Sequence, residues 1–200
     1  MKRYVVGITG ASGAIYGLRL VEVLLASGGK VTLLLTNAGR QVTAFETGLK
    51  LPEPFADCQA ALRGYFRGHE QFEYVALNDF FAPIASGTSA PDAVVVCPCS
   101  MGTAGRIAAG LSENLLERAA DVALKERREL ILVPRESPFN QIHLENLLRL
   151  SRAGAHILPA MPGFYQHPQS VADMVDFVVG KVLDSMKVEH QLCKRWGETE

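Results

Sequence analysis

Close to its start the chain reads Tyr4-Val5-Val6-Gly7-Ile8-Thr9-Gly10-Ala11-Ser12-Gly13, a short apolar run that ends in a loop of glycines and small polar residues. A helical pattern follows over residues 15–26, and a second apolar run occupies residues 31–35. Continuous apolar runs of this length predict buried strands. The stretch therefore predicts the order strand, loop, helix, strand.

Three further apolar runs continue this pattern, at residues 93–96, at residues 130–133 and, more weakly, at residues 155–158. Polar loops and helical periodicity follow each of them. Strands that are apolar at every position are covered on both faces. We therefore expect one α/β domain over residues 1–200, built on a mostly parallel sheet with helices on both faces.

Two other segments complete the predicted layout. The last helix begins at Ser170, which forms a capping-box-like start with Asp173, and its apolar residues then recur at helical spacing. Residues 52–92 are the least regular part of the chain, with four prolines and a small-polar stretch. We interpret them as a long excursion around a site and not as a second domain.

Composition excludes several classes of protein. Twenty Lys and Arg against twenty-one Asp and Glu argue against a nucleic-acid or membrane-surface binder. No apolar stretch reaches the ~18 residues of a spanning helix. The four cysteines are spaced neither as a disulfide framework nor as a zinc site. We expect buried thiols, no bound metal and a cytoplasmic, reducing location.

The strand ends are where chemistry is expected, because a parallel sheet binds its ligand beyond the carboxyl ends of the strands. The loop at residues 9–13 opens a helix there, so its glycines permit close approach and its amides favour an anion, although tight packing alone explains it equally well. Thr36 and Asn37 follow the second strand. Neither is acidic, which argues against a nicotinamide dehydrogenase.

Later strand ends carry further candidate residues. Residues 97–103 form a second small-residue loop, in which Ser100 is either a ligand contact or simply a helix cap. Two such loops on neighbouring strands could grip both ends of a mononucleotide. Arg135 suits a phosphate and Glu136 suits proton transfer, the alternative being a surface ion pair. Lys181, taken alone, is typical of a surface lysine.

Six segments, in order along nearly the whole chain, resemble the UbiX-type flavin prenyltransferases. They are TGASGA (9–14), SGTSAP (86–91), CPCSMGT (97–103), ERAADVALKE (117–126), PRE (134–136) and PGFY (162–165). The resemblance implies a Rossmann-like or flavodoxin-like homo-oligomer, typically a dodecamer. It also implies transfer of a dimethylallyl group from dimethylallyl phosphate to N5 and C6 of reduced flavin mononucleotide (FMN), whose product serves a UbiD-type decarboxylase.

The resemblance assigns roles residue by residue. Contacts with the flavin nucleotide fall to Gly10, Ala11, Ser12, Thr36, Ser100, Met101, Gly102, Thr103 and Arg135. Tyr165 and Lys181 would hold the prenyl phosphate together with Arg135, and Lys125 and Glu136 would reach in from neighbouring subunits. Thr36 stands where relatives often have serine, and Lys181 where some have arginine.

Proton transfer and closure of the site are also implied. Ser12 and Glu46 would manage protons near the flavin ring, with Glu136 as a further catalytic group. Trp196 resembles a C-terminal aromatic that closes over the site, so residues 187–200 are expected to pack over the site or over a neighbouring subunit. The chain has no aspartate-rich magnesium motif, so we expect metal-independent transfer.

Other functions remain open at this point. A flavin-dependent cysteine decarboxylase would share the fold and cofactor, but none of the five histidines lies in the context that such enzymes use. A flavin carrier without chemistry of its own is a second alternative. A decarboxylase subunit is a third, which a decarboxylation assay without a partner protein would test.

Overall fold

A computed structural model describes residues 1–193, and its centre is one six-stranded parallel sheet. The strands are β1 (Arg3–Ile8), β2 (Lys30–Leu35), β3 (Phe72–Tyr74), β4 (Ala93–Cys99), β5 (Glu129–Pro134) and β6 (His156–Ile157). Their order across the sheet is β3-β2-β1-β4-β5-β6. Tyr4 on the central strand pairs with Val31 on one side and with Ala93 on the other. The predicted parallel α/β architecture is confirmed.

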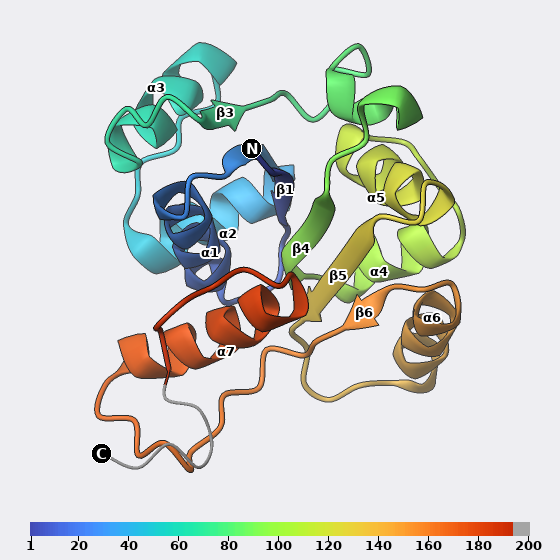
Figure 1. Cartoon of the computed structure of the whole chain (residues 1–200). Helices are drawn as coiled ribbons and strands as arrows, with labels where there is room; N and C mark the ends of the chain where they lie inside the picture. Colours follow the sequence, from blue (N-terminus) through green and yellow to red (C-terminus); the bar gives the residue numbers. More distant parts are fainter. Residues whose placement is uncertain (194–200) are drawn as a thin grey trace.

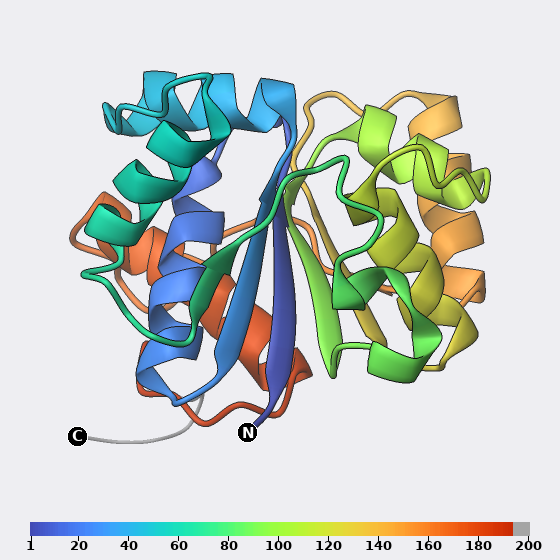
Figure 2. The same ribbon diagram turned by 90° about the horizontal axis from the view of Figure 1, so that it is seen from above.

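Helices cover both faces of the sheet (Figure 1). One face carries α1 (Ala14–Ala26), α3 (Phe55–Tyr65) and α7 (Val171–Ser185), and the other carries α4 (Met101–Ala108), α5 (Leu115–Lys125) and α6 (Gln141–Arg152). Figure 2 shows the two layers on either side of the twisted sheet, with α2 (Asn37–Thr47) lying at the end where the strands finish.

The core consists of two apolar clusters, one on each face of the sheet. Along β1, Val6 and Ile8 point into the cluster with α1 and α7, whereas Val5 points into the cluster with α4 and α5. This two-sided burial explains the continuous apolar runs in the central strands β1 and β4. At Gly7 an added Cβ would overlap Leu116, so the missing side chain lets α5 lie close to the sheet.

The segment at residues 52–92 contains more regular structure than the sequence indicated. It holds α3, the three-residue β3 and two short 3-10 helices, Pro83–Ala85 and Gly87–Ser89. The buried side of α3 consists of only Cys58 and Leu62, so its apolar stripe was too narrow to be recognised. At the other end of the chain, Ser170 and Asp173 form the predicted capping box of α7.

Within residues 1–193, no helix combines the length and apolarity needed to cross a membrane. Trp196 lies outside the described residues. The described part of the C-terminal segment runs back along the α1 and α7 layer, where Val188 and Leu192 pack against the core. Its expected closure over the site or over a neighbouring subunit stays a prediction.

Candidate functional site

The loops after β1 and β4 are joined by Thr9, a fully buried residue. Its Oγ1 donates a hydrogen bond to the Pro98 carbonyl oxygen at 2.8 Å and accepts one from the Ser100 amide at 2.7 Å. The Thr9 amide donates to the same Pro98 oxygen at 3.2 Å. Because β1 and β4 are neighbours in the sheet, these bonds hold both small-residue loops at one point beyond the strand ends.

Glu46 lies at the amino end of α1. Its Oε2 accepts hydrogen bonds of 2.9 Å from the Gly13 amide and 2.9 Å from the Ala14 amide. The sequence predicted that these amides favour an anion, and the anion they bind in this structure is the chain's own carboxylate. A ligand phosphate therefore needs other donors.

The surroundings of Glu46 lower the pKa of its carboxyl group. Burial alone would raise this pKa, but hydrogen bonds from Ser12, Gly13 and Ala14, together with the Arg135 charge, outweigh burial and hold it below its ordinary value. Glu46 is therefore ionised at neutral pH. Its hydrogen bond with Ser12 brings the two predicted proton-handling residues together.

The first turn of α2 approaches the end of β1 very closely. Thr36 caps the helix by accepting a 2.9 Å hydrogen bond from the Gly39 amide, and a hydroxyl that accepts in this way still has a hydrogen to donate. An added Cβ at Gly39 would overlap the Ile8 carbonyl oxygen, and one at Gly10 would lie 2.7 Å from the Ala38 Cβ. Bare backbone is thus required on both sides of this gap.

An ion pair between the buried Glu117 and the partly exposed Arg106 supports the first turn of α4. Ser100 caps that helix, and its hydroxyl donates to the Thr103 Oγ1 at 3.1 Å. Arg106 donates to the same Thr103 oxygen at 3.3 Å and to the carboxylate of Glu117, which is only 1% exposed. Arg106 and Glu117 were not recognised as a pair from the sequence, because 11 residues separate them and no local spacing rule joins them.

Arg135 and Glu136 follow β5 at the same edge of the sheet. The Arg135 amide donates to the Cys99 carbonyl at 3.3 Å, and the Ser137 amide donates to the Glu136 carboxylate at 3.1 Å. Burial raises the pKa of the Tyr16 phenol, and the Arg135 guanidinium opposes that shift. Arg135 therefore acts on both Tyr16 and Glu46. In the described part of the chain, no ion pair joins Arg135 to Glu136, so the surface-pair alternative is not supported.

Tyr165 and Lys181 form a second group, gathered around Phe177 of α7. The Tyr165 ring meets the Phe177 ring edge-on, with 5.7 Å between centroids. The Lys181 ammonium lies 5.7 Å from the centroid of the same ring and 3.9 Å from an Asp184 oxygen.

Lys125 is the predicted site residue that lies away from the strand-end loops. It ends α5, shortly before β5 begins at Glu129, so it lies at the opposite end of the sheet from the loops after β1 and β4. It forms an ion pair with Glu126 beside Gly87. Within one chain Lys125 cannot reach those loops, and only a neighbouring subunit could bring it to them.

Cys97 and Cys99, at the end of β4, do not form a metal site with each other. Cys97 packs in the cluster with α1 and α7, and Cys99 packs in the cluster with α4 and α5. Burial raises the pKa of both thiols. Facing opposite sides of the sheet, they are not arranged to share one metal ion. Among residues 1–193 no cluster of His, Cys, Asp and Glu could hold a metal.

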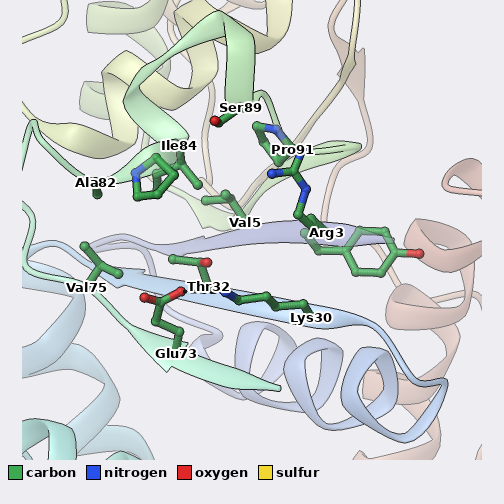
Figure 3. A pocket seen from close by; sticks show the side chains of 12 residues that line it. Arg3, Val5, Lys30, Thr32, Glu73, Val75, Ala82, Ile84, Ser89 and Pro91 are labelled. Carbon is green, nitrogen blue, oxygen red and sulfur yellow. Dashed lines mark ion pairs between the residues drawn. The ribbon is translucent and has the colours of Figure 1, made fainter. Parts of the chain in front are cut away.

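A separate cavity of about 60 Å³ lies against the sheet near the amino ends of β1 and β2 (Figure 3). Its charged groups are already paired. Lys30 is 3.5 Å from a Glu73 oxygen, and the Arg3 guanidinium donates to the Ala90 carbonyl at 2.9 Å. This cavity lies at the opposite end of the sheet from the loops after β1 and β4.

Comparison with known proteins gives consistent matches. The flavoprotein family matches residues 1–192. A Pseudomonas aeruginosa protein named flavin prenyltransferase UbiX is 52% identical over 198 residues, covering 98% of this chain and 95% of the relative.

Two solved structures are also similar. AnUbiX (PadA1), in complex with FMN and dimethylallyl pyrophosphate, is 35% identical with a TM-score of 0.87, covering 100% of this chain and 99% of that one. A dodecameric FMN-dependent UbiX-like decarboxylase from Escherichia coli O157:H7 is 39% identical with a TM-score of 0.85, covering 98% and 100%.

Proposed function

The chain belongs to the UbiX flavin prenyltransferases of the flavoprotein family, and on that premise we propose that it transfers a dimethylallyl group from dimethylallyl phosphate to reduced FMN. The observation that carries the proposal is the Thr9 junction, which holds the two small-residue loops together beyond the strand ends. A similar chain is described in complex with FMN and a prenyl donor.

The residues at this junction fit a flavin mononucleotide. Gly10 and Gly39 leave bare backbone where a side chain would collide, and Thr36, Ser100 and Thr103 supply hydroxyls. We assign the flavin nucleotide to Gly10, Ala11, Ser12, Thr36, Ser100, Met101, Gly102, Thr103 and Arg135. When bound and reduced, the flavin supplies the nucleophilic N5 and C6.

Binding the leaving phosphate is the task of the cationic residues. An allylic phosphate ionises when positive charge and hydrogen bonds stabilise the departing phosphate and water is excluded. Arg135 lies at the end of β5, and Lys181 and Tyr165 are held together around Phe177. We assign the prenyl phosphate to these three residues, with Lys125 and Glu136 contributed by neighbouring subunits and Trp196 closing the site.

Proton transfer falls to Ser12, Glu46 and Glu136. Glu46 is held ionised by the Gly13 and Ala14 amides, and it is bonded to Ser12. A proton that leaves the flavin ring can therefore pass to Ser12 as the Ser12 hydrogen moves toward Glu46. We assign Glu136 to proton transfer at the departing phosphate.

The proposal extends to assembly and location. A 39% identical chain is described as dodecameric, and Lys125 lies too far from its own strand-end loops to serve them. We therefore assign a homododecamer of single-domain subunits, whose product passes to a UbiD-type decarboxylase. The buried thiols Cys58, Cys97 and Cys99 fit a reducing cytoplasm.

One anaerobic incubation tests the proposal. Purified protein is mixed with reduced FMN and dimethylallyl phosphate, and the flavin is examined by mass spectrometry. The expected product is FMN heavier by one dimethylallyl group, formed in the presence of a metal chelator. Bound flavin of unchanged mass would identify a carrier, and carbon dioxide released from a peptidyl cysteine would identify a cysteine decarboxylase.

A further inference from the structure

Phe177 occupies the point where two proposed substrate-binding residues meet. The residue is only 8% exposed and belongs to the core cluster with α1 and α7. Its ring meets the edge of Tyr165 at 80° and lies 5.7 Å from the Lys181 ammonium. A buried ring in contact with both residues can fix their positions relative to each other.

The loop that carries Tyr165 also rests on this ring. At Gly163 an added Cβ would lie 2.8 Å from the Phe177 Cζ and 2.9 Å from the Tyr165 Cε1. The backbone at Gly163 must therefore pass close to both rings, which requires the absence of a side chain there. Phe177 thus sets the height of this loop above α7 as well as the angle of the Tyr165 ring.

The Phe177 ring also contacts the Lys181 ammonium group, and it leaves the lysine charge available where a carboxylate would neutralise it. The face of an aromatic ring attracts an ammonium group without neutralising it. Lys181 follows Phe177 by one helical turn, and its side chain remains 48% exposed. Within residues 1–193 its carboxylate partner is Asp184, whose Oδ2 is 3.9 Å away and whose Oδ1 lies closer, at 3.2 Å, to a ring nitrogen of His190. Lys181 is therefore oriented yet still able to bind a phosphate.

We infer that Phe177 is a positioning residue for the prenyl donor, acting through Tyr165 and Lys181 and not through the flavin. This inference rests on the proposed function, because it takes the donor phosphate to be the ligand of those two residues. The flavin-facing loops after β1 and β4 have their own supports, Thr9 and the pair of Arg106 with Glu117. Loss of the Phe177 ring should therefore separate donor affinity from flavin affinity.

The test compares Phe177→Leu with Phe72→Leu. Phe72 is a matched control, because it is 1% exposed and packs on another ring, Phe66, at 4.6 Å, but lies on β3. Each variant is loaded with oxidised FMN, which prevents turnover, and calorimetry measures its dissociation constant for dimethylallyl phosphate. Phe177→Leu should raise that constant about tenfold and the flavin constant less than about twofold. Phe72→Leu should change neither.

A double variant tests whether Phe177 affects donor binding through Lys181. If Phe177 acts largely through Lys181, the combination of Phe177→Leu with Lys181→Met should weaken donor binding by clearly less than the product of the two single effects. The inference would be overturned if the effects of the two single substitutions on donor binding simply multiply in the double variant. It would also be overturned if Phe177→Leu weakens flavin and donor binding equally, or if Phe177→Leu and Phe72→Leu give the same donor dissociation constant. Phe177→Met replaces Phe177→Leu if the latter does not fold.

Failure of the proposed function would look different. Wild-type protein that binds the donor but leaves reduced FMN unchanged in mass would refute the transferase activity. The donor constants of the variants would still decide the position of Phe177, because they are measured without turnover.

Discussion

At the scale of single residues, Glu46 decides how the amino end of α1 is used. A helix amino terminus attracts negative charge because its first amides have no partners within the helix. Glu46 supplies that charge from α2 and, through Ser12, connects it to the proposed flavin site. The Glu46 carboxylate thus accepts hydrogen bonds from the first amides of α1 and also orients the Ser12 hydroxyl.

We predict that Glu46→Gln removes an acid-dependent part of the stability. Because the folded pKa of Glu46 lies below its ordinary value of 4.5, its contribution is present above pH 4.5 and is lost as the pH falls through the folded pKa. Allowing for solvent screening, the contribution is about 1 kcal/mol. Urea unfolding of wild type and Glu46→Gln at several pH values measures it, and Glu145→Gln, on an exposed helix face, is the control. Parallel curves for wild type and Glu46→Gln would contradict the prediction.

At the scale of elements, Thr9 joins the ends of β1 and β4. Its hydroxyl both donates and accepts inside the protein, and it is fully buried. Removing that hydroxyl leaves the Ser100 amide without its bond at the position where α4 begins. The two loops would then lose their common anchor.

For Thr9→Val we predict a loss of about 2 kcal/mol in the free energy of unfolding, because buried backbone groups lose their partner while the shape is kept. The FMN dissociation constant should rise about tenfold, as the two loops separate. Thr9→Ser, which restores the hydroxyl, should recover most of both losses. Chemical denaturation and flavin fluorescence titration measure them, and a Thr9→Val protein with wild-type flavin affinity would show that the junction is structural only.

A second prediction at this scale concerns two helical glycines. An added Cβ at Gly17 of α1 would overlap the Cys97 carbonyl oxygen and lie 2.6 Å from the Ile8 Cγ1, whereas at Gly64 of α3 nothing lies within 4 Å. Gly17→Ala should destabilise the protein by about 2 kcal/mol through overpacking. Gly64→Ala should stabilise it by about 0.5 kcal/mol through helix propensity. Thermal unfolding of both variants should therefore shift in opposite directions, and a Gly17→Ala protein as stable as wild type would refute the close approach of α1 to β4.

At the scale of the whole molecule, a single subunit leaves large aromatic side chains in water. Phe81 is fully exposed, with a relative exposure of 101%, and Phe45 is 91% exposed. Single exposed apolar side chains are common on protein surfaces, so their burial between subunits has to be tested by substitution. The position of Lys125, at the opposite end of the sheet from its own strand-end loops, favours an assembly in which subunits complete one another's sites.

We predict that Phe81→Asp weakens this assembly, because a charge replaces an apolar contact between subunits. Light scattering coupled to gel filtration should show a smaller species than wild type, with reduced prenyl transfer. Phe81→Tyr keeps the aromatic surface and should assemble as wild type. A Phe81→Asp protein of unchanged mass would place Phe81 outside the interface.

Five of the six strands in the described residues, and the last helix, could be predicted because their signals are local. Runs that are apolar at every position indicated strands buried on both faces, and Ser170 with Asp173 indicated the start of α7. The position of the candidate loops followed as well, since all parallel strands end at one edge. By contrast, α3 and β3 were missed because one has a narrow apolar stripe and the other only three residues.

By itself the sequence determined the layers of this protein and the edge at which its chemistry lies, because hydrophobic periodicity and strand-end loops are properties of neighbouring residues. Only the tertiary structure decided which side chains meet there. Thr9 and Pro98 are 89 residues apart, and Gly13 and Glu46 are 33 apart. Such contacts depend on the order of strands in the sheet and on the packing of helices across it, which no local pattern encodes.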